Sequence, residues 1–159
     1  MKKHLLSAFL LFILVFAFEG CSWVNHFYIT NNSAKEITVE FQLKDSSNAM
    51  PLFYTGNNVH EAYQANKNGG PEHGSLAKFQ KIPLENPLHF KITILPNTTL
   101  QIGALFNDKY ESYKQDFING RFFNLVSLKI TKGDAIMIIN SNQFDSHLKK
   151  ISGDFVIIL

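Results

Sequence analysis

Strict alternation of apolar and polar residues constrains the fold of this chain more than any other feature of its sequence. In "EITVEFQL" (36–43) every second residue is apolar, beginning with Ile37. "LHFKITIL" (88–95) and "TLQIGALF" (99–106) alternate in the same way, and "LVSLKIT" (125–131) does so less cleanly. A period of two is typical of a strand with one face on a core and the other in water. The sequence therefore predicts half-buried β-strands in these segments.

Two further apolar segments have no polar face. "AIMII" (135–139) and "FVIIL" (155–159) are continuous apolar runs, which we interpret as fully buried central strands. Turn-forming residues separate the predicted strands, as in "TNNSAKE" (30–36), "LPNTT" (95–99) and "TKGD" (131–134). This spacing predicts an all-β fold: a single antiparallel β-sandwich of Ig-like or Greek-key type with about seven or eight strands. A closed barrel is the alternative, because the pattern does not separate the two.

Two segments break the alternation. Residues 55–75 ("TGNNVHEAYQANKNGGPEHGS") are polar, rich in Gly and Asn and without a period, so we expect a long loop there. Residues 107–121 place three aromatic side chains at i, i+3 and i+7, beginning with Tyr110. With Gly120 as the C-cap, this spacing predicts one short amphipathic helix that lies over an end of the sandwich.

The N-terminal residues follow a different pattern. Two lysines precede an apolar run (5–18), and Gly20 and Cys21 follow it. A membrane-spanning helix needs about 20 apolar residues, so this run is short for a span and suits the apolar region of a secretory signal. Cys21 is the only cysteine of the chain and has no partner for an internal disulfide. These features predict a signal helix that ends at a cysteine with a different role.

This arrangement resembles the signal peptide and lipobox of bacterial lipoproteins, in which a small residue precedes the cysteine that ends the signal. The resemblance covers residues 1–21. It implies that residues 1–20 are removed and that Cys21 carries acyl chains such as palmitate, which together anchor a protein stably to a membrane. An uncleaved signal-anchor is the alternative. Residues 22–30 hold no acid, which the resemblance associates with an outer-membrane protein that faces the periplasm.

The rest of the chain (21–159) has the length of one domain with one core. The signal removes two lysines and Glu19 from the chain's 15 basic and 13 acidic residues, so the remainder is almost neutral. Arg121 is the only arginine. Because arginine dominates the recognition of phosphate and guanine, and because the signal implies export, we predict no nucleic-acid partner.

The sequence holds no specific catalytic or metal-binding motif. His60 and Glu61 begin like a zinc-helix motif, but position 64 is glutamine rather than histidine. Convergence of this pair with Glu72 and His73 is an alternative to their being solvated loop residues. Ser75 lacks the G-x-S-x-G context of a nucleophile, and no phosphate-binding or dinucleotide fingerprint occurs. We therefore predict a non-enzymatic protein with no catalytic residue, no metal and no cofactor.

Four tyrosines are the candidates for ligand binding, because each falls in or beside an irregular segment that is rich in asparagine. Aromatic faces beside amide groups suit sugars or peptides. The alternative is that these tyrosines only pack the loop and helix onto the sandwich. The four residues are Tyr54, Tyr63, Tyr110 and Tyr113.

These observations predict a lipid-anchored protein of the bacterial cell envelope, with the membrane as one partner and an envelope protein or glycan as the other. The first hypothesis is a non-catalytic sandwich for protein interaction or scaffolding. The second is a module that binds carbohydrate or another small ligand through segments 55–75 and 107–121. A hydrolase with dispersed catalytic residues is a third. A pilin-like subunit, whose segment 155–159 completes a neighbour's sheet, is a fourth.

Overall fold

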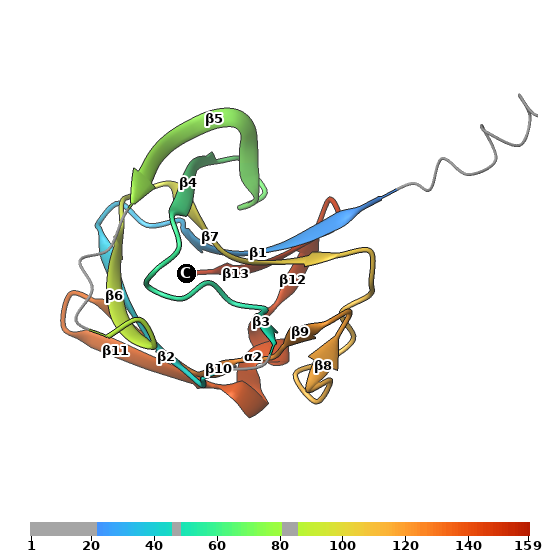
Figure 1. Ribbon diagram of the computed structural model, residues 1–159. Helices are drawn as coiled ribbons and strands as arrows, with labels where there is room; N and C mark the ends of the chain where they lie inside the picture. The colour runs from blue at the N-terminus through green and yellow to red at the C-terminus, as the bar shows by residue number, and fades with distance from the viewer. Residues whose placement is uncertain (1–21, 46–48, 81–85) are drawn as a thin grey trace, which may run out of the picture.

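The computed structural model describes residues 22–45, 49–80 and 86–159, with the backbone alone described over 76–80. The expected signal peptide (1–20) and Cys21 lie outside these residues. The described chain consists mostly of strands in two large sheets and one small sheet, and it confirms the predicted all-β sandwich (Figure 1). The strands are more numerous than predicted, because several are only two or three residues long.

The two large sheets share the core between them. The six-stranded sheet has the order β12 (Lys149–Ile151), β13 (Asp154–Ile158), β1 (Val24–Asn31), β7 (Thr98–Phe106), β4 (His60–Ala65), β5 (Pro71–Gln80). The four-stranded sheet has the order β11 (Ala135–Asn140), β10 (Leu125–Lys132), β2 (Ile37–Leu43), β6 (His89–Ile94). Most neighbours are antiparallel, but β1 and β13 are parallel, so the last strand completes its own sheet.

A small sheet and a short helix cover one side of the sandwich. The small sheet has the order β3 (Met50–Pro51), β9 (Arg121–Phe122), β8 (Phe117–Ile118), and β3 and β9 are parallel. The helical segment is a 3-10 turn, η1 (Ser141–Gln143), followed by α2 (Phe144–His147). Phe144 from α2 enters the core and packs against Phe27 and Phe53. Full burial of each such ring contributes about 1.5–3 kcal/mol.

The turns after β1 and after β6 carry the chain from one large sheet to the other. Both turns depend on Asn31, whose side chain is fully buried. Its Nδ2 donates to the carbonyl of Lys35 at 2.8 Å and to that of Ile94 at 3.0 Å. One buried amide therefore joins the end of β1 to the end of β6, with its own hydrogen-bonding groups satisfied.

The helix that we predicted over residues 107–121 is wrong. The segment forms turns and the β8–β9 hairpin instead, and the one short helix of the chain is α2. Asn119 and Gly120 both have positive φ angles, 45° and 74°. Two such residues form the tight turn that matches the twist of a hairpin, and a helix cannot continue through them. Gly120 is therefore a hairpin residue and not a helix C-cap.

The long loop that we predicted over residues 55–75 is also wrong. Most of it lies in β4 and in the first half of β5, which pair antiparallel. The polar "NKNGG" stretch is the tight turn between them, in which the Asn66 side chain accepts from the amides of Asn68 and Gly70. The Gly- and Asn-rich composition therefore marks a turn within a hairpin.

The prediction that "AIMII" is a buried central strand is wrong as well. It forms β11, which is the edge of the four-stranded sheet. Ile136 and Ile138 are exposed, and only Ile139 is fully buried. The other apolar run, in β13, lies between β12 and β1 as a central strand, with Val156 and Ile157 buried.

Candidate functional site

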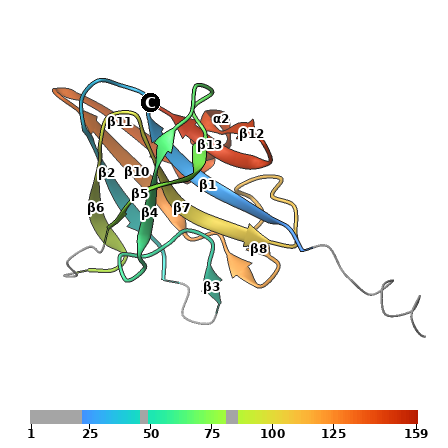
Figure 2. The same cartoon turned by 90° about the horizontal axis from the view of Figure 1, so that it is seen from above.

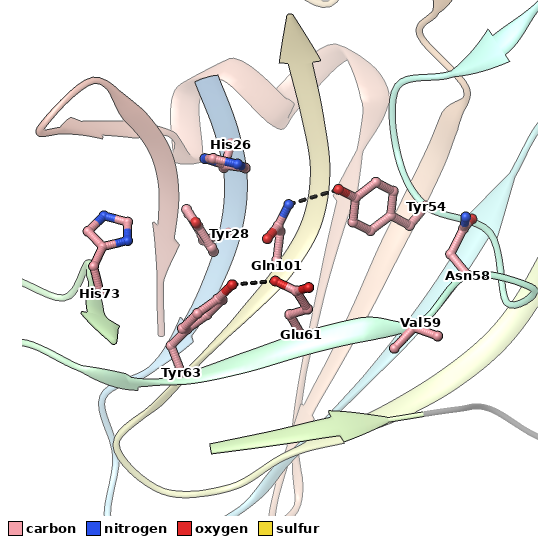
Figure 3. A pocket seen from close by; sticks show the side chains of 9 residues that line it. All are labelled: His26, Tyr28, Tyr54, Asn58, Val59, Glu61, Tyr63, His73 and Gln101. Carbon is pink, nitrogen blue, oxygen red and sulfur yellow. Dashed lines mark hydrogen bonds between the residues drawn. The ribbon is translucent and has the colours of Figure 1, made fainter. Parts of the chain in front are cut away.

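A cavity lies on the outer face of the six-stranded sheet, away from the sandwich core; Figure 3 shows the side chains that line it. Alternation along β1 explains its position, because Phe27 and Ile29 enter the core and Tyr28 points to the opposite face. The β4–β5 hairpin arches over this face (Figure 1). The cavity has a volume of about 480 Å³. It is lined by His26, Tyr28, Tyr54, Asn58, Val59, Glu61, Tyr63, His73 and Gln101.

A glycine on β7 brings Tyr54 to this cavity. Gly103 pairs with Phe53 in an isolated bridge, and the amide of Tyr54 donates to the carbonyl of Ile102 at 2.8 Å. A Cβ at Gly103 would lie 2.5 Å from the carbonyl oxygen of Leu52. Only glycine therefore lets this segment run against β7, next to β4.

Hydrogen bonds between lining residues fix two of the tyrosines. The Nε2 of Gln101 donates to the Tyr54 hydroxyl at 2.8 Å, and the Tyr63 hydroxyl donates to a carboxylate oxygen of Glu61. Burial and the neighbouring Glu61 carboxylate raise the pKa of Tyr63 to about 12. Burial also raises the pKa of Tyr54. Both hydroxyls are therefore neutral at physiological pH and act as hydrogen-bonding groups.

Tyr28 forms the floor of the cavity. Its side chain is buried, and its ring lies 5.7 Å from that of His26 and 6.3 Å from that of Tyr63. Burial raises the pKa of its phenol, with a smaller contribution from the Asp154 carboxylate. Among the described residues, none is a hydrogen-bond partner of the Tyr28 hydroxyl. This donor and acceptor remains free for a ligand.

His26 is held in one orientation by a buried carboxylate on β13. Asp154 Oδ1 accepts from the backbone amide of His26 at 2.8 Å, and it lies 3.2 Å from the His26 Nδ1. A carboxylate only accepts, so the proton of this contact belongs to Nδ1. The opposite ring nitrogen, Nε2, is then the one left for a ligand.

His60 lies behind the cavity, on the core face of β4. It is fully buried among the rings of Phe41, Phe90 and Tyr54. Its Nε2 lies 3.3 Å from the Thr55 carbonyl oxygen, while its Nδ1 has no partner among the described residues. Burial lowers the pKa of His60, so the ring is neutral near pH 7. The interpretation of His60 as a solvated loop residue is therefore wrong.

The structure separates the four tyrosines that the sequence singled out. Tyr54 and Tyr63 line the cavity. Tyr110 is buried beside Phe27 and donates its hydroxyl to Asp145 at 2.6 Å. Tyr113 is half-buried against the core, and its backbone amide also donates to Asp145, at 3.1 Å. Segment 107–121 therefore contributes no residue to the cavity.

Sequence reasoning missed Tyr28, His26 and Gln101, which supply the floor and one wall of the cavity. A signal for them exists. Residues next to core positions on a strand point to its opposite face, and Tyr28 and Gln101 flank Phe27, Ile29, Leu100 and Ile102. What alternation does not show is that the β4–β5 hairpin covers this face.

The described residues offer no preformed metal site, because they contain no group of three or more His, Cys, Asp or Glu side chains that could hold an ion. His60 lies in the core, while Glu61 and His73 line the cavity and Glu72 is exposed. Within the part of the chain that the structure describes, there is also no helix long and apolar enough to cross a membrane. Comparison with models of known protein families, with curated proteins and with solved structures found no significant match.

Proposed function

We propose that this chain is a lipid-anchored protein of the bacterial envelope whose sandwich domain binds a neutral saccharide, without catalysis, in the cavity on the outer face of the six-stranded sheet. The single observation that carries the proposal is the composition of this cavity. Eight of its nine lining side chains have a hydrogen-bonding group, and three of those eight are tyrosines. Its volume of about 480 Å³ suits a small ligand.

Saccharides match this composition for two physical reasons. A pyranose ring has a face of C–H bonds that packs on an aromatic ring, and Tyr54 and Tyr63 are partly accessible from the cavity. Its edge carries hydroxyls, each a donor and an acceptor, which the Glu61 carboxylate, the Gln101 amide and the Tyr28 hydroxyl can satisfy. Glu61 is the only acid of the lining, so the site offers one strong acceptor and no cationic clamp.

Saturation-transfer NMR and calorimetry on the full chain in detergent micelles test this proposal. The probes are N-acetylglucosamine, galactose and glucose, with choline as a cationic comparison. We expect at least one sugar to bind and Glu61→Gln to weaken its affinity about tenfold, because hydrogen bonds to a charged group contribute about 1.5–3 kcal/mol. Glu111→Gln is the matched control, since Glu111 is exposed and far along the chain from the cavity.

Two outcomes contradict the saccharide proposal. The first is binding of choline alone, which would make the tyrosines a cation site. The second is sugar binding that is equal in Glu61→Gln and in Glu111→Gln, which would place the ligand outside this cavity. Mass spectrometry of the mature N-terminus tests the anchor separately. A chain that begins at an acylated Cys21 supports it, and an intact residue 1–20 segment with a free thiol contradicts it.

A protein-interaction role is the second candidate, and the edge strand β11 favours it. Residues 135–140 contain no charged residue and no proline, the usual protections of a free edge. A photo-crosslinking amino acid at position 138, expressed in the native envelope, should give a discrete adduct. The same group at position 42, on the outer face of the same sheet, should give none. Equal labelling at both positions would contradict a specific partner for this edge.

A further inference from the structure

Exposed tryptophan and phenylalanine side chains gather at one end of the molecule. Among the described large hydrophobic residues, those that are exposed include Trp23 (53%), Phe106 (43%) and Phe117 (61%), and no other tryptophan or phenylalanine. Trp23 precedes β1, Phe106 ends β7 and Phe117 begins β8, and these ends lie on the same side in both views (Figures 1 and 2). We call these three residues the aromatic end.

Hydrogen bonds of Asn107 and Asn119 to the backbone hold the aromatic end in place. The amide of Trp23 donates to the Asn107 side-chain oxygen at 3.0 Å, and the amide of Asn107 donates to the carbonyl of Trp23 at 3.0 Å. The Nδ2 of Asn119, at the tip of the β8–β9 hairpin, donates to the carbonyl of Phe106 at 2.6 Å. Trp23, Phe106 and the β8–β9 hairpin are therefore joined by hydrogen bonds, although they are far apart in the sequence.

A cation completes this surface. The guanidinium of Arg121 lies over the Phe106 ring, 4.9 Å from its centroid, and its Nη1 donates to the Pro51 carbonyl at 3.0 Å. Tryptophan is enriched at the level of lipid headgroups, and membrane-surface segments combine Trp and Phe with basic side chains. A salt bridge 3.5 Å long joins two other charges of this region, those of Lys109 and Glu111.

We infer that the aromatic end lies in the headgroup layer of the bilayer and seats the sandwich on the membrane. The inference rests on the proposed lipid anchor at Cys21. Only Ser22 lies between Cys21 and Trp23, and two residue steps reach at most about 7 Å. Acyl chains on Cys21 therefore bring the aromatic end to the bilayer surface. The occupant of this apolar surface is therefore lipid.

A second exposed apolar region, on β11, provides a comparison. Ile136 (60%) and Ile138 (55%) on β11 are as exposed as the aromatic end, but they are aliphatic and lie at the opposite side of the molecule from the start of β1 (Figures 1 and 2).

Segment 107–121 has three acidic and three basic residues, so its net charge is zero. Contact with lipid should therefore be equal on neutral and anionic bilayers and insensitive to salt.

Trp23 provides the measurement, because it is the only tryptophan of the chain. The acylated full chain is reconstituted in vesicles of phosphatidylethanolamine and phosphatidylglycerol, with and without bromine atoms on the upper part of the acyl chains. We expect Trp23 emission to shift to shorter wavelength and to be quenched by the brominated lipid. Flotation of the same vesicles reports the anchor itself. Protein that floats with the vesicles but has water-like, unquenched emission overturns the inference and leaves the anchor standing.

Paired variants separate insertion of the aromatic end from mere tethering. In Phe106→Ser/Phe117→Ser the apolar contact is reduced, and we expect Trp23 to lose most of its quenching while the protein still floats. Ile136→Ser/Ile138→Ser removes two equally exposed apolar side chains at the far side and should keep full quenching. Thermal unfolding monitors the fold of both variants. Equal quenching in both, or emission that is shielded yet not quenched by bromine, overturns the inference.

Discussion

The outer faces of the two large sheets have the same strand geometry but form different surfaces. On the six-stranded sheet, Tyr28 and Gln101 line a cavity under the β4–β5 hairpin. On the four-stranded sheet, the outward positions carry Glu40, Lys91 and Lys129, which form ion pairs at the surface with no described element covering them. Alternation therefore determines which residues point away from the core, whereas the elements that cover a face determine whether those residues form a site.

The two faces also differ in how their polar groups are satisfied. Thr30 and Thr99 are buried on the six-stranded sheet, where the Thr30 hydroxyl donates to the Gly69 carbonyl at 2.6 Å and lies 2.9 Å from the Thr99 hydroxyl. Glu40 instead pairs with Lys91 and Lys129, whose side chains are exposed to water. Buried hydrogen bonds fix the position of the hairpin, whereas exposed ion pairs contribute little to stability.

The largest difference between the faces should follow from placing one alanine on a strand of each sheet. We expect Gly103→Ala to lower the free energy of unfolding by about 3 kcal/mol, because the added Cβ overlaps the backbone of Leu52 and the segment must shift. The shift should also displace Tyr54 and weaken sugar binding. Chemical denaturation measures the first effect and calorimetry the second.

Ser127 provides the control on the four-stranded sheet. It is half-buried, and its hydroxyl donates to the Gln42 side chain at 3.2 Å at the surface. We expect Ser127→Ala to change stability by no more than about 0.5 kcal/mol. A Gly103→Ala protein as stable as Ser127→Ala would mean that segment 52–54 is held loosely and does not define the cavity.

The sequence predicts the strands whose alternation is regular, and it fails where a local pattern has two explanations. β2 and β6 follow their predicted bounds closely, because every second residue of each strand, such as Ile37 and Phe41 in β2, occupies the core face. In segment 107–121 the spacing from Tyr110 to Phe117 imitates a helix face. The Asn119-Gly120 pair is a stronger signal, because it predicts a two-residue hairpin turn.

The cavity could be predicted only in part. Tyr54 and Tyr63 stand out because they lie in polar sequence, but Tyr28 and Gln101 stand inside regular strands and resemble ordinary surface positions. They become part of a cavity because the β4–β5 hairpin arches over them, and Gly103 admits segment 52–54 beside β7. These are long-range contacts, which a single sequence does not reveal.

Two glutamines, one on each large sheet, allow a further test of the difference between the two outer faces. Gln101 and Gln42 point outward from the two different sheets, and each takes part in one side-chain hydrogen bond. We expect Gln101→Leu to weaken sugar binding about tenfold, since one or two neutral hydrogen bonds contribute about 0.5–1.5 kcal/mol each. Gln42→Leu should leave the affinity unchanged. Equal affinities for both variants would contradict a role for Gln101 in binding.

His60 should make the free energy of unfolding depend on pH, with a smaller effect than the substitutions above. Burial holds its folded-state pKa below the unfolded value of 6.5, so the unfolded chain binds a proton first as the pH falls. The contribution of the neutral His60 ring to the free energy of unfolding is therefore fully present above pH 6.5, and it is lost as the pH falls through the folded-state pKa. For this one group, the free energy of unfolding changes by at most about 1.4 kcal/mol for each pH unit.

Denaturation at several pH values checks this, and two substitutions sharpen it. His60→Leu should flatten the plot of unfolding free energy against pH below pH 6.5. The substitution also removes the buried Nδ1 that has no partner among the described residues. Phe90→Leu, at a ring that packs against His60, should lower the curve at every pH and keep its slope. An unchanged slope in His60→Leu would assign the acid sensitivity to another group.

The smallest effect should come from the charges on the four-stranded sheet. The hydrogen bond from His89, with Lys91 and Lys129, lowers the pKa of Glu40 below its usual value of 4.5. The contribution of the ionised carboxylate is therefore complete above about pH 4.5 and is lost as the pH falls through the folded pKa. Near neutral pH, Glu40→Gln should cost about 0.5–1 kcal/mol at low salt and less at high salt. Denaturation at two salt concentrations measures this, and a cost that salt does not change would show that this open face is less solvated than its geometry indicates.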